Sequence, residues 1–286
     1  MTRRILLLLP TALALAFVIA FALHRTFGPP RPPACFAMGH GPTVVLVHGL
    51  GSRTQHWLPV ARLLARDHRV VLVELPGHDL SEMPEPFSLA RATRALDEAI
   101  AAESRGPVVL VGHSVGGLVA ANEALEHPER VRALVLVETA LRPQVEGKER
   151  AAMLAALDRD YQGVLRNAFT AFGRDSAQGA QLYAEVAQMD PAMVKPWIQL
   201  ALTLDISLRM RHLMPPLLAV LAERSWPKDE PWPVTAKALG YADAPDVKTA
   251  RITDCGHFIM LDRPAELARL IERFAADPAR EPIALR

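Results

Sequence analysis

The chain has 286 residues, 50% of them hydrophobic, and its formal net charge at pH 7 is +1. This length is enough to bury a sizeable core, and the near balance of charges argues against a basic nucleic-acid-binding surface and against an acidic solvating tail. The two cysteines, Cys35 and Cys255, provide neither a metal-binding pattern nor a disulfide framework, although a single bridge between them stays open.

The N-terminal segment is strongly apolar. Basic residues on both sides enclose an apolar run from Ile5 to Leu23, and Ala20 to Ala22 offer a small-x-small cleavage site. We expect an N-terminal hydrophobic helix over residues 1–27 that acts as an uncleaved membrane anchor, with a cleaved signal peptide as the alternative. In either case the rest of the chain is expected outside the cytoplasm, either anchored to the membrane or secreted or periplasmic. Residues 28–38 then predict a proline-rich linker that leads into a first strand region.

The remainder of the chain alternates between short apolar runs rich in Val and Leu and stretches with apolar residues at helical spacing. Strands that are continuously apolar are typical of parallel sheets covered on both faces, so we predict an α/β fold with a mostly parallel central sheet and helices on both faces. The predicted strands are 43–47, 69–74, 107–111, 131–137, 216–221 and 247–252. The predicted helices are 52–66, 88–102, one directly after Ser114, 149–159, 163–172, 178–188, 192–211, 232–239 and 264–274.

The alternation is interrupted once. Residues 141–213 contain helical segments and no strand-like run, which predicts a helical cap inserted after the strand that ends at Glu138. The α/β core is then formed by residues 39–140 and 214–286. An insertion at this point covers the C-terminal edge of the sheet, where α/β proteins bind ligands, and its methionines suit irregular apolar ligands.

The most informative stretch joins the predicted strand 107–111 to a helix through the sequence Gly-His-Ser-Val-Gly at residues 112–116. Strand, G-x-S-x-G and helix in this order are typical of a nucleophile elbow. The sharp turn forces Ser114 into a strained conformation, and its glycine neighbours leave room for it. We therefore predict that Ser114 is a nucleophile at a helix N-terminus, where developing negative charge is favoured.

A serine nucleophile needs a general base and donors for the oxyanion. Of the ten histidines, His257 combines a flanking glycine with a position directly after the last predicted strand, so we predict it as the base. The predicted oxyanion donors are the backbone N–H groups of Leu50, in the loop after strand 43–47, and of Val115, which follows the nucleophile.

Four motifs carry a family resemblance: G-P-T-V-V-L-V-H-G-L-G, E-L-P-G-H-D-L-S, V-G-H-S-V-G-G-L-V-A and D-C-G-H-F-I-M-L-D-R-P. Together they cover residues 39–274 and resemble the α/β-hydrolase fold superfamily, in the branch of carboxylesterases, lipases and C–C hydrolases. Serine at position 114 argues against the dehalogenase and epoxide-hydrolase branches, which use Asp there.

The third member of the catalytic triad departs from this resemblance. Relatives place an Asp shortly after the strand that follows the cap, but here that position is Ser225. Some branches take the acid from the end of the strand before the cap, where this chain has Glu138. The resemblance therefore implies Glu138 as the acid, with Glu223 and Asp229 as alternatives. Asp254 and Asp262 flank His257, and we expect them to fix its loop and cap the last helix.

The resemblance implies a serine hydrolase of carboxylic esters that forms an acyl-enzyme and needs no metal or cofactor. Its expected partners are a small-molecule or lipid-like ester and, through the N-terminal segment, a membrane; no nucleic acid is expected. Two alternatives stay open: another enzyme of the same fold (a C–C hydrolase, lactonase or perhydrolase), and a non-catalytic binding module.

Overall fold

The computed structural model describes residues 35–79 and 81–278. The predicted N-terminal hydrophobic helix and most of the proline-rich linker lie outside these residues. Among the helices of the described part, none is long and apolar enough to cross a membrane. Cys35 and Cys255 both lie in the described part and are not joined by a disulfide.

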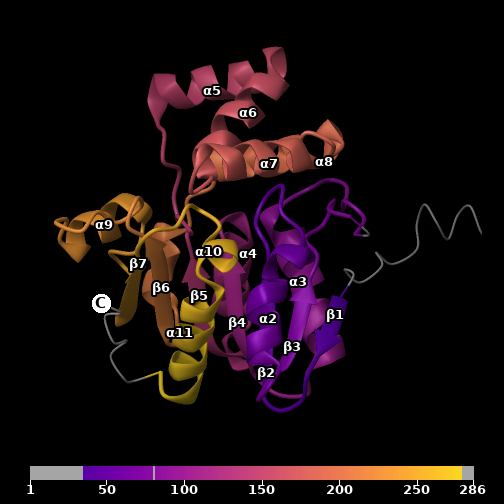
Figure 1. Cartoon of the computed structure of the whole chain (residues 1–286), viewed down its shortest axis with the longest axis vertical. Helices are drawn as coiled ribbons and strands as arrows, with labels where there is room; N and C mark the ends of the chain where they lie inside the picture. The colour runs from indigo at the N-terminus through magenta and orange to yellow at the C-terminus, as the bar shows by residue number, and fades with distance from the viewer. Residues whose placement is uncertain (1–34, 80, 279–286) are drawn as a thin grey trace, which may run out of the picture. The chain divides into compact units, whose positions relative to one another are not determined.

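The centre of the structure is a seven-stranded sheet in the order β1-β3-β2-β4-β5-β6-β7 (Figure 1). Strand β1 pairs with β3 in antiparallel orientation, and all the other pairs are parallel. The prediction of a mostly parallel sheet is therefore confirmed. The strands are β1 Cys35–Met38, β2 Thr43–Val47, β3 Arg69–Val73, β4 Val108–His113, β5 Val131–Val137, β6 Leu217–Ala222 and β7 Val247–Ile252.

Helices follow most of the strands along the chain, and short 3-10 turns lie between some of these elements. The α-helices outside the region between β5 and β6 are α2 Leu58–Leu64, α3 Leu89–Glu103, α4 Val115–Glu126, α9 Trp232–Leu239, α10 Ile259–Asp262 and α11 Pro264–Ala276. The 3-10 turns are η1 Thr54–Trp57, η2 Pro128–Arg130 and η3 Ser207–His212. Helix α3 begins after Ser88, whose side chain accepts a hydrogen bond from the backbone N–H of Arg91.

The core consists of two apolar layers, one on each face of the sheet. Successive side chains of a strand point to opposite faces, so Val44 and Leu46 of β2 lie in one layer and Val45 and Val47 in the other. Helices α2 and α11 complete the first layer, and α3 and α4 complete the second. Both faces are therefore covered, which explains why the strands are continuously apolar in sequence.

Four helices lie between β5 and β6: α5 Gly147–Arg159, α6 Tyr161–Phe172, α7 Ser176–Val186 and α8 Pro191–Thr203. Three of them begin at an aspartate whose side chain accepts a backbone N–H of the first turn, namely Asp160, Asp175 and Asp190. Figure 1 shows the four helices gathered beyond one end of the sheet. We call this group of helices the cap.

Two predicted helices differ from the structure. The stretch 52–66 is divided into η1 and α2, and the predicted helix 192–211 ends at Thr203. In the second case Asp205 interrupts the helix, because its carboxylate accepts hydrogen bonds from both the backbone N–H and the hydroxyl of Ser207. Such local side-chain hydrogen bonds compete with helical ones, and the chain continues as η3.

Candidate active site

Ser114 lies at the junction between β4 and α4 with φ 53° and ψ −125°, a conformation that residues other than glycine rarely adopt. Its backbone N–H donates to the carbonyl of Val137 at 3.0 Å, which joins the turn to the neighbouring strand β5. A Cβ added at Gly116 would lie 2.0 Å from the carbonyl oxygen of His48, and one added at Gly112 would lie 2.6 Å from that of Gly116. The two glycines of G-x-S-x-G are therefore required by close backbone contacts, and the turn has the strained geometry predicted for it.

His257 follows β7 and is fixed through its backbone and its ring. Its N–H donates to the carbonyl of Phe172 at 2.8 Å, and its own carbonyl accepts from Nε2 of His113 at 2.9 Å. Its Nδ1 lies 3.0 Å from Oε2 of Glu138. Because a carboxylate only accepts, this contact places the proton on Nδ1 and leaves the lone pair on Nε2, the atom that a general base uses.

Glu138 lies directly after β5, and its side chain is 1% exposed. Its Oε1 accepts the N–H of Ala222 at 2.7 Å, and its Oε2 accepts the hydroxyl of Ser225 at 2.8 Å in addition to Nδ1 of His257. Of the two alternatives, Glu223 is half-buried and Asp229 is exposed. Within the described part of the chain, neither forms a hydrogen bond or ion pair with His257. The structure thus brings together the first of the three predicted acids and the predicted base.

The relation between Ser114 and His257 is less direct. Ser114 follows His113, whose ring centroid lies 4.7 Å from that of His257. The buried Nε2 of His257 has no hydrogen-bond partner in residues 35–79 and 81–278, so the Ser114 hydroxyl is not bonded to it. Catalytic hydrogen bonds are often long or unformed without substrate and tighten when it binds.

The loop after β2 lies against the Ser114 turn. A Cβ added at Gly49 would lie 3.0 Å from Cβ of Ser114 and 2.8 Å from Nδ1 of His113. Leu50, the next residue, and Val115, the first residue of α4, supply the two predicted oxyanion donors. In the part of the chain that the structure describes, neither N–H donates a hydrogen bond. The N–H of Val115 belongs to the first turn of α4, whose donors have no partner within the helix.

A network of buried polar side chains supports this loop, and the sequence motifs do not reveal its connections. His48 contacts Glu74, with Nε2 and Oε2 3.2 Å apart, and His78 accepts the N–H of Gly51 on its Nε2 at 3.2 Å. Burial by itself raises the pKa of Glu74, but hydrogen bonds from His48 and Thr54 lower it below its ordinary value. Burial also lowers the pKa of His78 to about 3. The loop next to Leu50 is therefore held by the charged carboxylate of Glu74 and the neutral imidazole of His78.

The cap contacts this loop and the one after β3. Side-chain atoms of Phe169 and Val186 approach Gly51 so closely that a Cβ there would lie 2.6 Å from each. The buried indole of Trp197 donates to the carbonyl of Pro76 at 2.9 Å. The cap helices therefore reach the same end of the sheet as Ser114 and His257.

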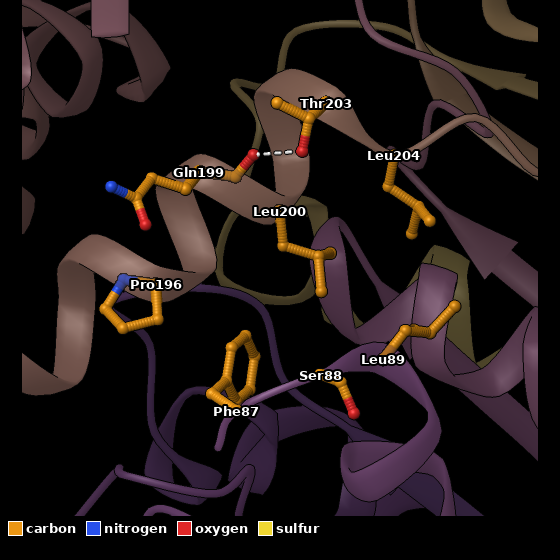
Figure 2. A pocket seen from close by; sticks show the side chains of 8 residues that line it. All are labelled: Phe87, Ser88, Leu89, Pro196, Gln199, Leu200, Thr203 and Leu204. Atoms are coloured by element: carbon orange, nitrogen blue, oxygen red, sulfur yellow. Dashed lines mark hydrogen bonds between the residues drawn. The ribbon is translucent and has the colours of Figure 1, made fainter. Parts of the chain in front are cut away.

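A cavity of about 520 Å³ lies between α8 and the segment that begins α3 (Figure 2). The Phe87 ring at its wall lies 4.7 Å from the ring of Trp197, which in turn lies 6.1 Å from that of His78. The buried indole of Trp197 therefore contacts both Phe87, at the wall of this cavity, and His78, in the loop after β3. The lining residues are Phe87, Ser88, Leu89, Pro196, Gln199, Leu200, Thr203 and Leu204, and they do not include Ser114 or His257.

The described residues include one cluster of side chains with the composition of a metal site. Asp97, Glu123 and His127, on α3 and at the end of α4, have potential ligand atoms within 4.8 Å of one another. Arg130 already places its Nε 2.8 Å from Oδ1 of Asp97, so a cation accompanies this carboxylate. The group contains none of the predicted catalytic residues.

A mostly parallel sheet with a strained serine turn after β4 and a histidine after the last strand is the architecture of the α/β hydrolases. The family model described as the alpha/beta hydrolase family matches residues 44–270, and the chain belongs to this family.

Its relatives include pimeloyl-[acyl-carrier protein] methyl ester esterases. The protein of that name from Nitrosospira multiformis is 25% identical over 259 residues, which is 84% of this chain and 96% of the relative. The one from Xanthomonas campestris pv. campestris is 29% identical over 252 residues, 84% of this chain and 97% of the relative. Among solved structures, a hydrolase from Oleispira antarctica superposes with a TM-score of 0.73 at 17% identity, over 86% of this chain and 95% of that one. The last comparison supports the fold alone.

Proposed function

We propose that this chain is a serine esterase that cleaves carboxylic esters through an acyl-enzyme. The Ser114 hydroxyl attacks the ester carbonyl while Nε2 of His257 takes its proton, and the backbone N–H groups of Leu50 and Val115 bind the oxyanion. His257 then gives the proton to the leaving alcohol. In the second half a water molecule, deprotonated by His257, attacks the acyl group, releases the carboxylic acid and restores Ser114.

The observation that carries this proposal is the hydrogen bond between Glu138 and His257. Nδ1 of His257 lies 3.0 Å from the buried carboxylate of Glu138. This contact keeps the ring in the tautomer whose Nε2 is free to accept a proton. The same carboxylate is oriented by Ala222 and Ser225, so the ring is held in one position. Such pre-organisation supports general-base chemistry next to the strained Ser114.

For the substrate we propose esters of acyl chains, including lipid-like ones. The names of the relatives refer to a methyl ester on an acyl chain, and the cap supplies apolar side chains near the loop that holds Leu50. A series of p-nitrophenyl and methyl esters of increasing acyl length tests this point. We expect kcat/KM to rise beyond acetate, and a flat or falling series would contradict an acyl-chain preference.

The chemistry itself is tested with a fluorophosphonate probe, which labels an activated serine. We expect the wild-type chain to be labelled and Ser114→Ala to remain unlabelled. The matched control is Ser225→Ala, which removes a serine hydroxyl that touches Glu138 and leaves the nucleophile in place, so it is expected to label, more slowly than wild type. An unlabelled wild-type protein would favour a non-catalytic binding module.

We also propose that residues 1–27 anchor the chain to a membrane, with the catalytic domain outside the cytoplasm. The apolar run from Ile5 to Leu23 with basic residues on both sides supports this. Membrane fractionation of the full chain and of a chain that starts at residue 28 tests it. We expect only the full chain to stay with the membrane after an alkaline carbonate wash.

A further inference from the structure

The segment that joins α6 to α7 in the cap lies directly against the His257 loop. The carbonyl of Phe172 accepts the N–H of His257 at 2.8 Å. A Cβ added at Gly256 would lie 2.5 Å from that same carbonyl oxygen and 2.5 Å from the N–H nitrogen of Arg174. Position 256 therefore has to be glycine for the cap to approach the base this closely.

The side chain of Phe172 also contacts the imidazole. The two rings are stacked, with centroids 4.5 Å apart and planes inclined by 25°. Phe172 comes from the C-terminal end of cap helix α6, whereas the other rings near the imidazole, His113 and Phe258, belong to the core. The cap thus supplies one of the surfaces that hold the imidazole in place.

A buried carboxylate connects the same two segments. The Asp262 side chain is 1% exposed, and its Oδ2 accepts the N–H of Gly256 at 2.8 Å. Its Oδ1 accepts Nε2 of Gln178 at 2.7 Å and Nη1 of Arg174 at 3.3 Å, both from the cap. Asp262 therefore fixes the residue before His257 and the start of α7 together.

We propose that Phe172 is a positioning residue for the general base, so that the cap forms part of the support of His257. This inference rests on the proposed function. When His257 takes the proton from Ser114, the resulting imidazolium faces the π surface of the phenyl ring, which attracts a cation. The stacked Phe172 ring also keeps the imidazole from rotating out of its hydrogen bond with Glu138.

The test compares Phe172→Leu, which keeps apolar volume but removes the ring, with Phe172→Tyr, which keeps the ring. Tyr183→Leu is the matched control, because it removes an aromatic ring from cap helix α7 that has no ring contact with His257. For a small p-nitrophenyl ester we expect Phe172→Leu to lower kcat about tenfold with KM nearly unchanged, in line with a partly buried cation–π contact. Phe172→Tyr and Tyr183→Leu are expected to stay within about twofold of wild type.

A spectroscopic measurement separates positioning from a general loss of structure. In the wild-type chain, ring-current shielding by Phe172 should move the carbon-bound imidazole protons of His257 upfield in the NMR spectrum. The shift should be lost in Phe172→Leu and kept in Phe172→Tyr, while the thermal unfolding midpoint of each variant is recorded on the same sample. If Phe172→Leu does not fold, Phe172→Met takes its place.

The outcomes distinguish the two proposals. A wild-type chain that reacts with fluorophosphonate, together with a folded Phe172→Leu chain of unchanged kcat, overturns the positioning role and leaves the esterase intact. A rise in KM with unchanged kcat also overturns it, because Phe172 would then contact substrate and not the base. A wild-type chain that neither labels nor hydrolyses any ester overturns both.

Discussion

Glu138 has an environment that suits a carboxylate acting through a histidine. Its φ of 50° turns the chain away from β5, and both of its oxygens accept hydrogen bonds. Ser225, at the position where the family resemblance leads us to expect an Asp, donates to this carboxylate at 2.8 Å. Glu138 and Ser225 thus belong to one hydrogen-bond network.

Replacing Glu138 by glutamine should lower kcat about 10³–10⁴-fold, because an amide in this place can hold the wrong tautomer of His257. Steady-state hydrolysis of a p-nitrophenyl ester measures the effect. Glu223→Gln is the matched control and is expected to stay near wild type. If Glu223→Gln were the inactive variant and Glu138→Gln the active one, the role of the acid would pass to Glu223.

At the scale of single residues, the sequence predicts which side chains form the site better than it predicts the hydrogen bonds between them. Ser114 can be predicted because the glycines around it signal a strained turn, and His257 because of its place after the last strand. The positive φ of Glu138 has no such signal, since glutamate is not a residue that favours it. The hydrogen bond from Ser225 could not be predicted either, because it depends on how the ends of β5 and β6 face each other.

At the scale of elements, the buried strands are the most predictable part of the fold. Continuous runs such as Val44 to Val47 are 0% exposed, so almost every residue carries the same apolar signal. Helix ends are less predictable, because a single polar side chain decides them. The Asp205–Ser207 hydrogen bonds divide one predicted helix into α8 and η3.

The short helix α10 ends at Asp262, and this residue gives a stability prediction. Asp262→Ala leaves the donors of Gly256, Gln178 and Arg174 without their buried acceptor, so we expect the free energy of unfolding to fall by about 2–4 kcal/mol. Urea denaturation followed by circular dichroism measures it. Asp158→Ala is the control: this side chain is 74% exposed and pairs loosely with Lys195 at 3.7 Å, so a change within about 0.5 kcal/mol is expected. Equal effects of the two variants would contradict the role given to Asp262.

At the scale of the whole molecule, several buried histidines make stability depend on pH. Burial lowers the pKa of His78 to about 3, and it also lowers the pKa values of His56 and of His113 below their ordinary value. A neutral histidine in the folded state with a depressed pKa takes up its proton only on unfolding. The contribution of these histidines to the free energy of unfolding is therefore fully present above about pH 6.5 and is lost as the pH falls below that value.

Glu123 acts in the opposite direction, because burial, with Asp97 nearby, raises its pKa to about 8. Its protonated form stabilises the fold below pH 4.5, and this contribution is lost as the pH rises toward 8. The histidine effect is therefore best measured in a Glu123→Gln background. There we expect the free energy of unfolding to fall from pH 6.5 to pH 4.5, and His78→Gln to reduce the slope by up to about 1.4 kcal/mol per pH unit. A slope that His78→Gln does not change would contradict this assignment.

The attachment of the cap to the core also belongs to the whole-molecule scale, and it is the part that sequence reasoning could not supply. An inserted helical segment is predictable from the missing strands between residues 141 and 213. Its anchoring contacts join Trp197 to Pro76, 121 positions apart, and Glu185 to His56, 129 positions apart. No local pattern encodes pairs at such separation, because they depend on the folded arrangement of both partners.

In the proposed reaction, Ser114 carries the acyl group during turnover. The most direct measurement is to mix the wild-type chain with excess p-nitrophenyl butyrate, quench with acid within milliseconds and map the modified peptide by mass spectrometry. We expect a butyryl group on Ser114 that disappears on longer incubation once the ester is consumed. Ester hydrolysis at full rate with the acyl group on another residue, or in a Ser114→Ala chain, would contradict it.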